Sequence, residues 1–511
     1  MISRRLFLAG TGALAAAPAF AQGDPTVATS LGPIRGTREG GLSVFRGIRY
    51  GVAPRFQAPR APLPGRDVVA ATRFGPSSPQ RGDRYEPTSE DCLFLNVWTP
   101  EAQAGGRRPV MVYIHGGAYS TGSVVDPLND GRHLASSGDV VVVTVNHRLN
   151  AFGYLYLARL DARFPDSGNA GQLDQILALQ WIRQNIAAFG GDPRRILVFG
   201  QSGGGAKIAT MMGMPAARGL FHRAITMSGQ QVTASGPLNA TARARAYLAA
   251  LKAAPADLLT LPTERLVEGL AATDPVLGGA VYMGPVLDMK WLTRHPFWPD
   301  PNPQSNAIPM ILGNTRDETR AFIDPDSDKV RSLDWTNLAE RIAPELRVDI
   351  HPEWVVSHYR RRFPDWSPER IFYAATTAGR SWPGQVMEAD ARAQAGAPTW
   401  VYQLDFQSPT QPRRGAPHTM DIALAFGTLD AEGSYTGTGA AARALSARMI
   451  KAFVALARTG DPNAGGVPAW PRYRLPDRST MVFDTVSRAE KDPRRWEREL
   501  FARAPYIQPG S

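Results

Sequence analysis

Residues 195–205 read RILVFGQSGGG, and this stretch decides the fold. Its apolar part, 196–199, is typical of a buried strand, and residues 206–211 just beyond it are typical of a helix. A serine flanked by glycines at a strand-to-helix turn is the pattern of a nucleophile elbow, where bulkier neighbours would collide. Ser202 is therefore predicted at the tip of the turn, above a helix N-terminus that favours negative charge.

Similar apolar runs and helical patterns recur along the chain. The strand-like runs are 110–114, 140–145, 309–312 and 399–404, and the helical patterns are 173–189 and, as the last helix, 441–459. This alternation predicts an α/β fold with a central, mostly parallel, twisted sheet flanked by helices. The mostly helical stretches between the runs predict large insertions within a single domain over 22–511.

Composition describes a folded globular protein of 511 residues, with 43% hydrophobic and 20% charged residues. The formal charge is +11, but acidic residues interrupt even the most basic stretch, 491–499. We interpret that stretch as a solvated surface, so nucleic-acid binding is not expected. Cys92 is the only cysteine, which excludes an intrachain disulfide.

The first 21 residues have the pattern of an export signal. Arg4 and Arg5 precede a short, small-residue apolar run, and residues 19–21 read AFA, as at a signal-peptidase site. The apolar run is too short to span a bilayer, and no later segment is apolar for longer. The sequence predicts a twin-arginine signal over 1–21, a periplasmic or secreted mature protein, and no stable membrane insertion.

A serine nucleophile needs a histidine base and an acid that orients the histidine. In hydrolases with a nucleophile elbow, the acid and then the histidine follow the serine in the chain. His418 fits best because it lies in a loop after the strand-like run 399–404. His358 is expected on an exposed helix, and His295, next to Pro296, in a loop of no clear type.

Two neighbouring carboxylates qualify as the orienting acid. Asp317 and Glu318 both follow the run 309–312, and the residue types alone do not distinguish them. An oxyanion also needs backbone N–H donors. The glycine-rich turn that begins at His115, together with the N–H of Gly203, is predicted to supply these donors.

Ordered motifs over nearly the whole mature chain extend this pattern. They are FRGIRY at 45–50, SEDCLFLNV at 89–97, HGG at 115–117, NHRL at 146–149, GNAGQLDQ at 168–175, FGGDP at 189–193, MSG at 227–229, NTRDE at 314–318, GAPH at 415–418 and GDPN at 460–463. With these motifs the chain resembles the type-B carboxylesterase/lipase family, which includes the cholinesterases and bacterial para-nitrobenzyl esterases. The resemblance implies an α/β-hydrolase fold.

The resemblance also assigns site residues. It implies that Glu318 is the catalytic acid, and that the oxyanion donors are Gly117, Ala118 and Gly203. It implies that the hydroxyl of Ser228 lies beside the acid–base pair. Outside the site, it implies two structural ion pairs, Arg55 with Glu90 and Arg148 with Asp174.

Three positions depart from the family pattern. Gln201, expected beside the catalytic residues, stands where the family usually has a glutamate, and Gly203 where it usually has an alanine. The cysteine that usually pairs with the one matching Cys92 is replaced by Ser78. The loop between them is short and lacks a tryptophan that could hold a quaternary ammonium, so cholinesterase activity is not expected.

The sequence thus predicts a serine esterase with a Ser202–His418–Glu318 triad, an acyl-enzyme intermediate, and neither cofactor nor metal. Its expected partner is a small-molecule ester of an uncharged alcohol. An amide or carbamate hydrolase with the same triad is the alternative, and a non-catalytic binding protein is a more distant one. The acyl chain and the oligomeric state are not indicated.

Overall fold

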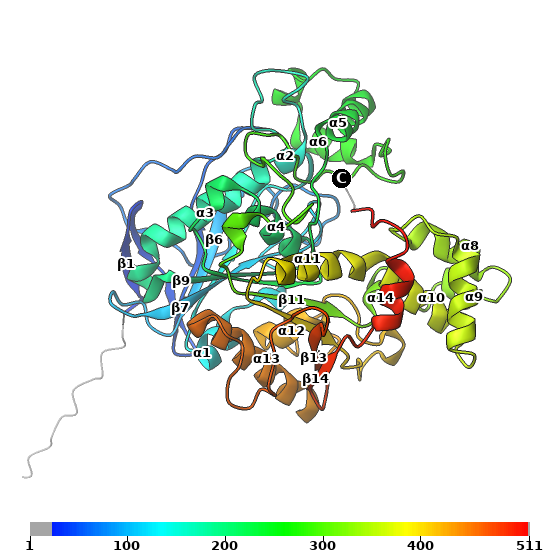
Figure 1. Cartoon of the computed structure of the whole chain (residues 1–511). Helices are drawn as coiled ribbons and strands as arrows, with labels where there is room; N and C mark the ends of the chain where they lie inside the picture. Colours follow the sequence, from blue (N-terminus) through cyan, green and yellow to red (C-terminus); the bar gives the residue numbers. More distant parts are fainter. Residues whose placement is uncertain (1–22, 509–511) are drawn as a thin grey trace, which may run out of the picture.

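A twisted sheet lies at the centre of the computed structural model, which describes residues 23–508 (Figure 1). In its order across the sheet, the 11 strands are β14 (Arg488–Lys491), β13 (Ser479–Phe483), β12 (Thr399–Leu404), β11 (Met310–Thr315), β10 (Arg223–Met227), β9 (Gly191–Gln201), β7 (Arg108–Ile114), β8 (Val141–Val145), β6 (Phe94–Thr99), β4 (Leu42–Arg49) and β3 (Thr37–Glu39). All neighbours from β13 to β8 pair in parallel, and the strands at both edges are antiparallel. The mostly parallel sheet is confirmed.

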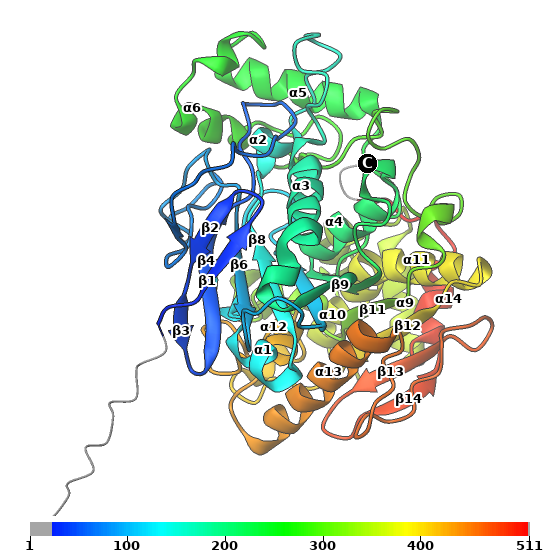
Figure 2. The ribbon, with the colours of Figure 1, turned by 90° about the vertical axis from the view of Figure 1, so that its left-hand side faces the viewer.

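A second, 3-stranded sheet stands beside the β3 edge and consists of β1 (Thr26–Thr29), β2 (Gly32–Arg35) and β5 (Val69–Ala70), as Figure 2 shows in part. The α-helices in chain order are α1 (Arg132–Gly138), α2 (Asn150–Tyr154), α3 (Ala170–Asn185), α4 (Gly203–Met212), α5 (Pro237–Leu251), α6 (Thr263–Glu268), α7 (Asp328–Arg331), α8 (Leu338–Ile342), α9 (Pro352–Arg362), α10 (Pro368–Thr376), α11 (Trp382–Gln394), α12 (Met420–Phe426), α13 (Ala440–Thr459) and α14 (Arg495–Phe501).

Helices cover both faces of the sheet. Successive side chains of β7 point to opposite faces of the sheet. Val112 lies in the apolar layer under α3, α4 and α11, and Tyr113 lies in the layer under α1, α12 and α13. Both residues are almost completely buried. Because both faces are covered, the central strands read as continuous apolar runs rather than as alternating ones.

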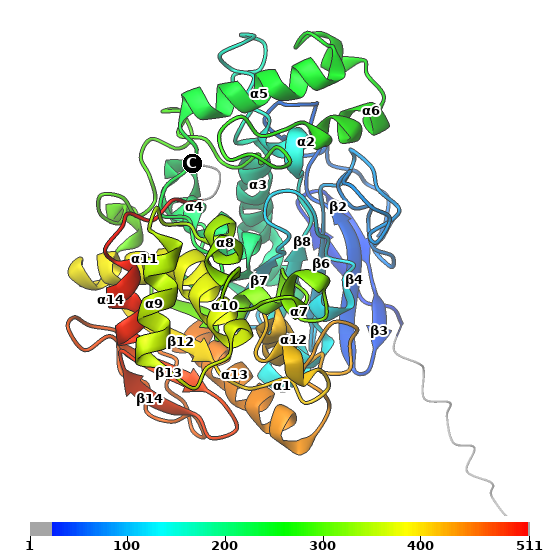
Figure 3. The same ribbon diagram turned by 90° about the vertical axis from the view of Figure 1, so that its right-hand side faces the viewer.

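Two helical insertions extend from this sandwich, as expected. The first includes α5 and α6 and has its own apolar cluster, to which Tyr247 and Leu266 belong. The second runs from α7 to α11, and Figure 3 shows α8, α9 and α10 stacked beside α14. The first insertion packs its helices on one another and against α2, whereas the second packs α11 on β11 and β12.

The structure confirms one expectation about helices and corrects another. The helix expected over 173–189 is present: α3 begins at Ala170 and runs to Asn185, and a 3-10 turn continues it to Phe189. It stops at Gly190 as expected, where a φ of 83° lies in the left-handed region. The helix ending at Thr459 is not the last one, because α14 follows it. The charged sequence of α14 hides its helical period: only Leu500 and Phe501 of that helix are buried.

Two buried side chains stand at the two positions of the family's usual disulfide. Ser78 and Cys92 are both buried, and burial raises the pKa of the Cys92 thiol to about 12. The two implied ion pairs are also present: Arg55 Nε lies 2.7 Å from Glu90 Oε2, and the buried Arg148 and Asp174 make a bidentate pair. The predicted signal segment, 1–21, lies outside the described residues.

Candidate active site

Ser202 stands at a strained turn between β9 and α4. Its φ of 56° and ψ of −127° are unusual for a residue with a side chain, and it is the only member of the predicted triad that is not buried. The turn is packed against backbone on every side. A Cβ atom on Gly204 would lie 2.0 Å from the Ile114 carbonyl oxygen, and one on Gly229 would lie 2.0 Å from that of Ser202. The glycines therefore permit a turn that presents the serine.

Of the two carboxylates that the sequence left open, Glu318 is the one that contacts a histidine. It lies three residues beyond the end of β11, is fully buried, and its Oε2 is in close hydrogen-bonding contact with Nδ1 of His418. Asp317 points elsewhere: its Oδ2 accepts the N–H of Ala416 at 3.0 Å, and its Oδ1 lies 3.7 Å from Arg320.

Three donors fix the other oxygen of Glu318. Its Oε1 accepts hydrogen bonds from the Ser228 hydroxyl at 2.6 Å, the Thr315 N–H at 2.7 Å and the Asn314 amide at 3.0 Å. Burial acts to raise the pKa of Glu318, but the charge of His418 and these bonds outweigh it, so the pKa is lowered. The acid is thus held as a carboxylate, with Ser228 beside it as the sequence implied.

His418 reaches this carboxylate from the loop between β12 and α12. Its ring is buried and packs against the exposed ring of Phe322, with centroids 4.8 Å apart. The two rejected histidines are engaged elsewhere: His295 accepts the N–H of Ala234, and His358 lies on α9 bonded to the Trp354 carbonyl. Since β9, β11 and β12 are parallel, their carboxyl ends bring the serine, acid and histidine to one edge of the sheet.

Gln201 contacts the other nitrogen of the histidine. Its amide Nε2 lies 3.1 Å from Nε2 of His418, and both side chains are buried. The amide donates to Nε2 when the imidazole proton is on Nδ1 and faces Glu318. This arrangement favours the tautomer whose Nε2 can accept a proton from a neighbouring hydroxyl. The sequence placed Gln201 beside the catalytic residues, as a departure from the family pattern, but did not predict this contact.

The glycine-rich turn after β7 lies against the serine turn. Gly117 and Ala118 both have positive φ, 84° and 54°, and a Cβ atom on Gly203 would lie 2.0 Å from the Ala118 carbonyl oxygen. The absence of a side chain at 203 therefore lets the two turns touch. The three residues predicted to supply oxyanion donors are brought together by this contact.

Lys207, which the sequence analysis missed, is buried beneath this turn. It lies on α4, its Nζ donates to the His115 carbonyl oxygen at 3.1 Å, and burial lowers its pKa to about 7. Burial and the nearby lysine lower the pKa of His115 to about 3, so that ring is neutral. A lysine within an otherwise apolar helix was the signal in the sequence that could have revealed this contact.

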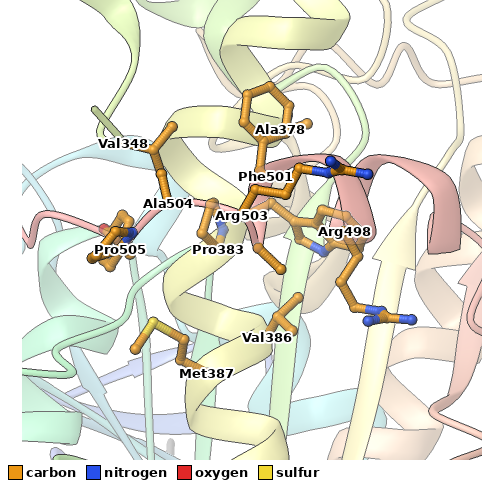
Figure 4. A pocket seen from close by; sticks show the side chains of 13 residues that line it. Val348, Ala378, Pro383, Val386, Met387, Arg498, Phe501, Arg503, Ala504 and Pro505 are labelled. Atoms are coloured by element: carbon orange, nitrogen blue, oxygen red, sulfur yellow. The ribbon is translucent and has the colours of Figure 1, made fainter. Parts of the chain in front are cut away.

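A separate apolar cavity of about 470 Å³ lies between α11, α14 and the segment after α14 (Figure 4). Val386 and Met387 line it from α11, and Phe501 lines it from α14. None of the predicted catalytic residues borders it. Within residues 23–508, no cluster of three or more histidines, cysteines and acids could hold a metal, and no helix is long and apolar enough to cross a membrane.

This sheet, with a strained serine after one strand and an acid–histidine pair after two others, defines an α/β-hydrolase. The chain belongs to the carboxylesterase family, whose model matches residues 23–498. It is a carboxylic-ester hydrolase.

This chain aligns with proteins of similar sequence or structure over almost their full length. The para-nitrobenzyl esterase of Bacillus subtilis is 34% identical over 93% of this chain and 97% of its own. The phenmedipham hydrolase of Pseudarthrobacter oxydans is 34% identical over 90% and 94%. The crystal structure of the Geobacillus stearothermophilus carboxylesterase EST55 has a TM-score of 0.83 at 35% identity, covering 93% of this chain and 99% of that one.

Proposed function

We propose that the enzyme hydrolyses esters of uncharged alcohols through an acyl-enzyme formed on Ser202. His418 Nε2 takes the proton of the Ser202 hydroxyl as its oxygen attacks the ester carbonyl, and returns it to the departing alcohol oxygen. Water then attacks the acyl-enzyme with the same histidine as base, and releases the acid. Glu318 holds the imidazole in the reactive tautomer and stabilises its charged form.

The contact between Glu318 and His418 is the observation that carries this proposal. A buried carboxylate that accepts three further hydrogen bonds cannot turn away from the ring, and so directs Nε2 of His418 toward the turn that bears Ser202. The 3.1 Å contact between this nitrogen and Gln201, the residue before Ser202, supports that direction.

The negative charge of the tetrahedral intermediate requires fixed donors. We assign this role to the N–H groups of Gly117, Ala118 and Gly203, which lie on the two touching turns. Removing one such donor in comparable sites slows turnover by about 100- to 1,000-fold. Lys207, bonded to the carbonyl of His115 just before this turn, positions the turn from below.

Substitution of the nucleophile tests the mechanism. Ser202→Ala should abolish covalent labelling by a fluorophosphonate probe and nearly all ester hydrolysis, with an unchanged circular dichroism spectrum. Ser136→Ala, at an exposed serine on α1, is the matched control and should label and turn over as the parent does. Hydrolysis by Ser202→Ala at more than a trace of the parental rate would contradict the assignment of the nucleophile.

We also propose that the chain is exported through the twin-arginine route to the periplasm. The Arg4–Arg5 pair, the short apolar run and the AFA sequence at 19–21 support this proposal. Changing both arginines to lysine should leave the active enzyme in the cytoplasm, measured as esterase activity in separated cell fractions. Undiminished periplasmic activity in this variant would point to another route.

A further inference from the structure

The segment 60–74 exposes apolar and basic side chains together, far along the chain from the catalytic residues. It reads RAPLPGRDVVAATRF and contains three arginines but a single acid, Asp67. Its exposed large apolar side chains are Leu63, Val68, Val69 and Phe74. Leu63 is 93% exposed, the highest value for any large apolar residue within 23–508. Four such residues on one segment are not scattered singly, and they indicate a contact surface.

Backbone hydrogen bonds hold this segment along the small sheet. The N–H of Gly65 donates to the Leu31 carbonyl oxygen at 3.0 Å, and the N–H of Ala71 donates to that of Arg35 at 2.7 Å. Between these two points β5 pairs in parallel with β2. β5 is the last strand of its sheet, so its outer edge pairs with no other strand of the described chain. The exposed apolar side chains are therefore presented on a fixed backbone.

The positive charges beside these apolar groups are not neutralised by the protein. Four exposed arginines belong to the surface: Arg35 of β2, Arg60, Arg66 and Arg73. None of the four forms an ion pair with any residue in 23–508. The neighbouring Arg46 of β4 differs, because its Nη2 lies 2.8 Å from Oε2 of Glu39. The surface thus keeps a net positive charge that is available to an anionic partner.

The combination of charges and apolar groups selects among partners. A second copy of the chain fits poorly, because β5 has only two residues, prolines at 62 and 64 precede it and arginines flank it, all features that prevent strand pairing at a sheet edge. Two copies meeting here would also bring like charges together. A soluble polyanion would bind the arginines but leave Leu63 in water.

An anionic phospholipid membrane satisfies both parts of the surface. Its phosphates attract arginines, and the boundary between headgroups and acyl chains accepts apolar side chains.

We propose that the segment 60–74 docks the enzyme on the surface of an anionic phospholipid membrane. Leu63 enters the boundary below the headgroups, and the arginines contact the phosphates. The surface belongs to the same small sheet as β1, the first strand of the described chain (Figure 2). The predicted export signal precedes this strand directly in the sequence, so the docking surface lies on the sheet at which that signal joins the fold.

Sedimentation with lipid vesicles tests the proposal. The mature chain from residue 22 is used, because the predicted signal would itself bind lipid and the described fold lies within 23–508. Vesicles of phosphatidylglycerol should bind the enzyme, vesicles of phosphatidylcholine should not, and high salt should release it. Combining Arg60→Gln, Arg66→Gln and Arg73→Gln should lower the partition coefficient about 100-fold, since each arginine near an anionic surface contributes about fivefold. Leu63→Ser should lower it about tenfold.

A second triple variant is the matched control, because it removes the same charge from exposed arginines outside the segment that also form no ion pair within 23–508. It combines Arg218→Gln, Arg443→Gln and Arg474→Gln, and should bind vesicles as the parent does. Hydrolysis of a water-soluble ester should be unchanged in every variant, which separates docking from catalysis.

Two results would overturn the proposal. One is the absence of binding to phosphatidylglycerol vesicles, or an equal loss of binding in the control. The other is a dimer in solution that Leu63→Ser dissociates, which would assign the surface to a second copy of the chain.

Discussion

Replacing Glu318 by glutamine should disable the enzyme through the tautomer of its histidine. Glu318 Oε1 accepts hydrogen bonds from the Ser228 hydroxyl, the Thr315 N–H and the Asn314 amide. Since all three are donors, the side-chain oxygen of the glutamine must take the place of Oε1. The new NH₂ group is then forced to face Nδ1 of His418. Two donors cannot bond to each other, so the ring proton moves to Nε2.

The loss follows from this reversed ring. A protonated Nε2 cannot accept the proton of Ser202, and it can donate to the Gln201 side-chain oxygen after rotation of that amide, which stabilises the unreactive form further. The loss of the negative charge at 318 also leaves the imidazolium unsupported. A comparable exchange in serine proteases slows turnover by about 10,000-fold, equivalent to about 5 kcal/mol in activation free energy.

Steady-state kinetics on one activated ester, together with the rate of fluorophosphonate labelling, measure this loss. Both rates should fall together while the melting temperature changes little, because all the hydrogen bonds to Oε1 survive. Asp317→Asn is the control, since its carboxylate bonds to the Ala416 N–H and lies near Arg320; it should cost less than tenfold. The reasoning is refuted if Glu318→Gln keeps more than about 1% of the parental kcat/KM, or if Asp317→Asn loses more.

Three further substitutions test buried groups. Lys207→Met should lower kcat about tenfold because the His115 carbonyl loses its hydrogen-bond donor, and an unchanged kcat would contradict this. The same variant should be more stable to urea at pH 6, because it removes a buried charge. Glu388, with its pKa raised by burial to about 8 from 4.5, holds an extra proton in the native state, so parental stability falls as pH rises between these values. Glu388→Gln should therefore gain about 3 kcal/mol on the parent between pH 4.5 and pH 7 in urea titrations, and a constant difference would be inconsistent with that pKa. Ser78→Cys should form a disulfide with Cys92 worth about 3 kcal/mol, seen as a higher melting temperature that added reductant abolishes.

The sheet and the serine turn could be predicted because their signals are local. Runs such as 140–145 are apolar throughout, since helices cover both faces of the strand. The glycines around Ser202 are required by the turn itself. By contrast, only Leu500 and Phe501 of α14 are buried. Two neighbouring apolar residues do not form the repeating apolar pattern by which a helix is recognised in a sequence.

The choice between Asp317 and Glu318 illustrates what residue types alone cannot decide. Both follow β11, and only the three-dimensional positions of Asn314, Thr315 and Ser228 determine which carboxylate is turned toward the histidine. Family resemblance pointed to Glu318. The buried contacts of Gln201 and Lys207 depend on residues 217 and 92 positions away, a separation that no sequence period reports.

The distance along the chain between the parts of the site has a consequence for biosynthesis. The parallel strands that carry Ser202, Glu318 and His418 are joined by long crossovers, and the histidine lies 100 residues beyond the acid. Pairings this remote in sequence form late and slowly. A chain that has emerged from the ribosome only as far as β11 contains Ser202 but not His418, the base of the proposed mechanism. We therefore expect esterase activity to begin only when β12 and the loop that bears His418 are in place, and a chain truncated before this loop to be inactive.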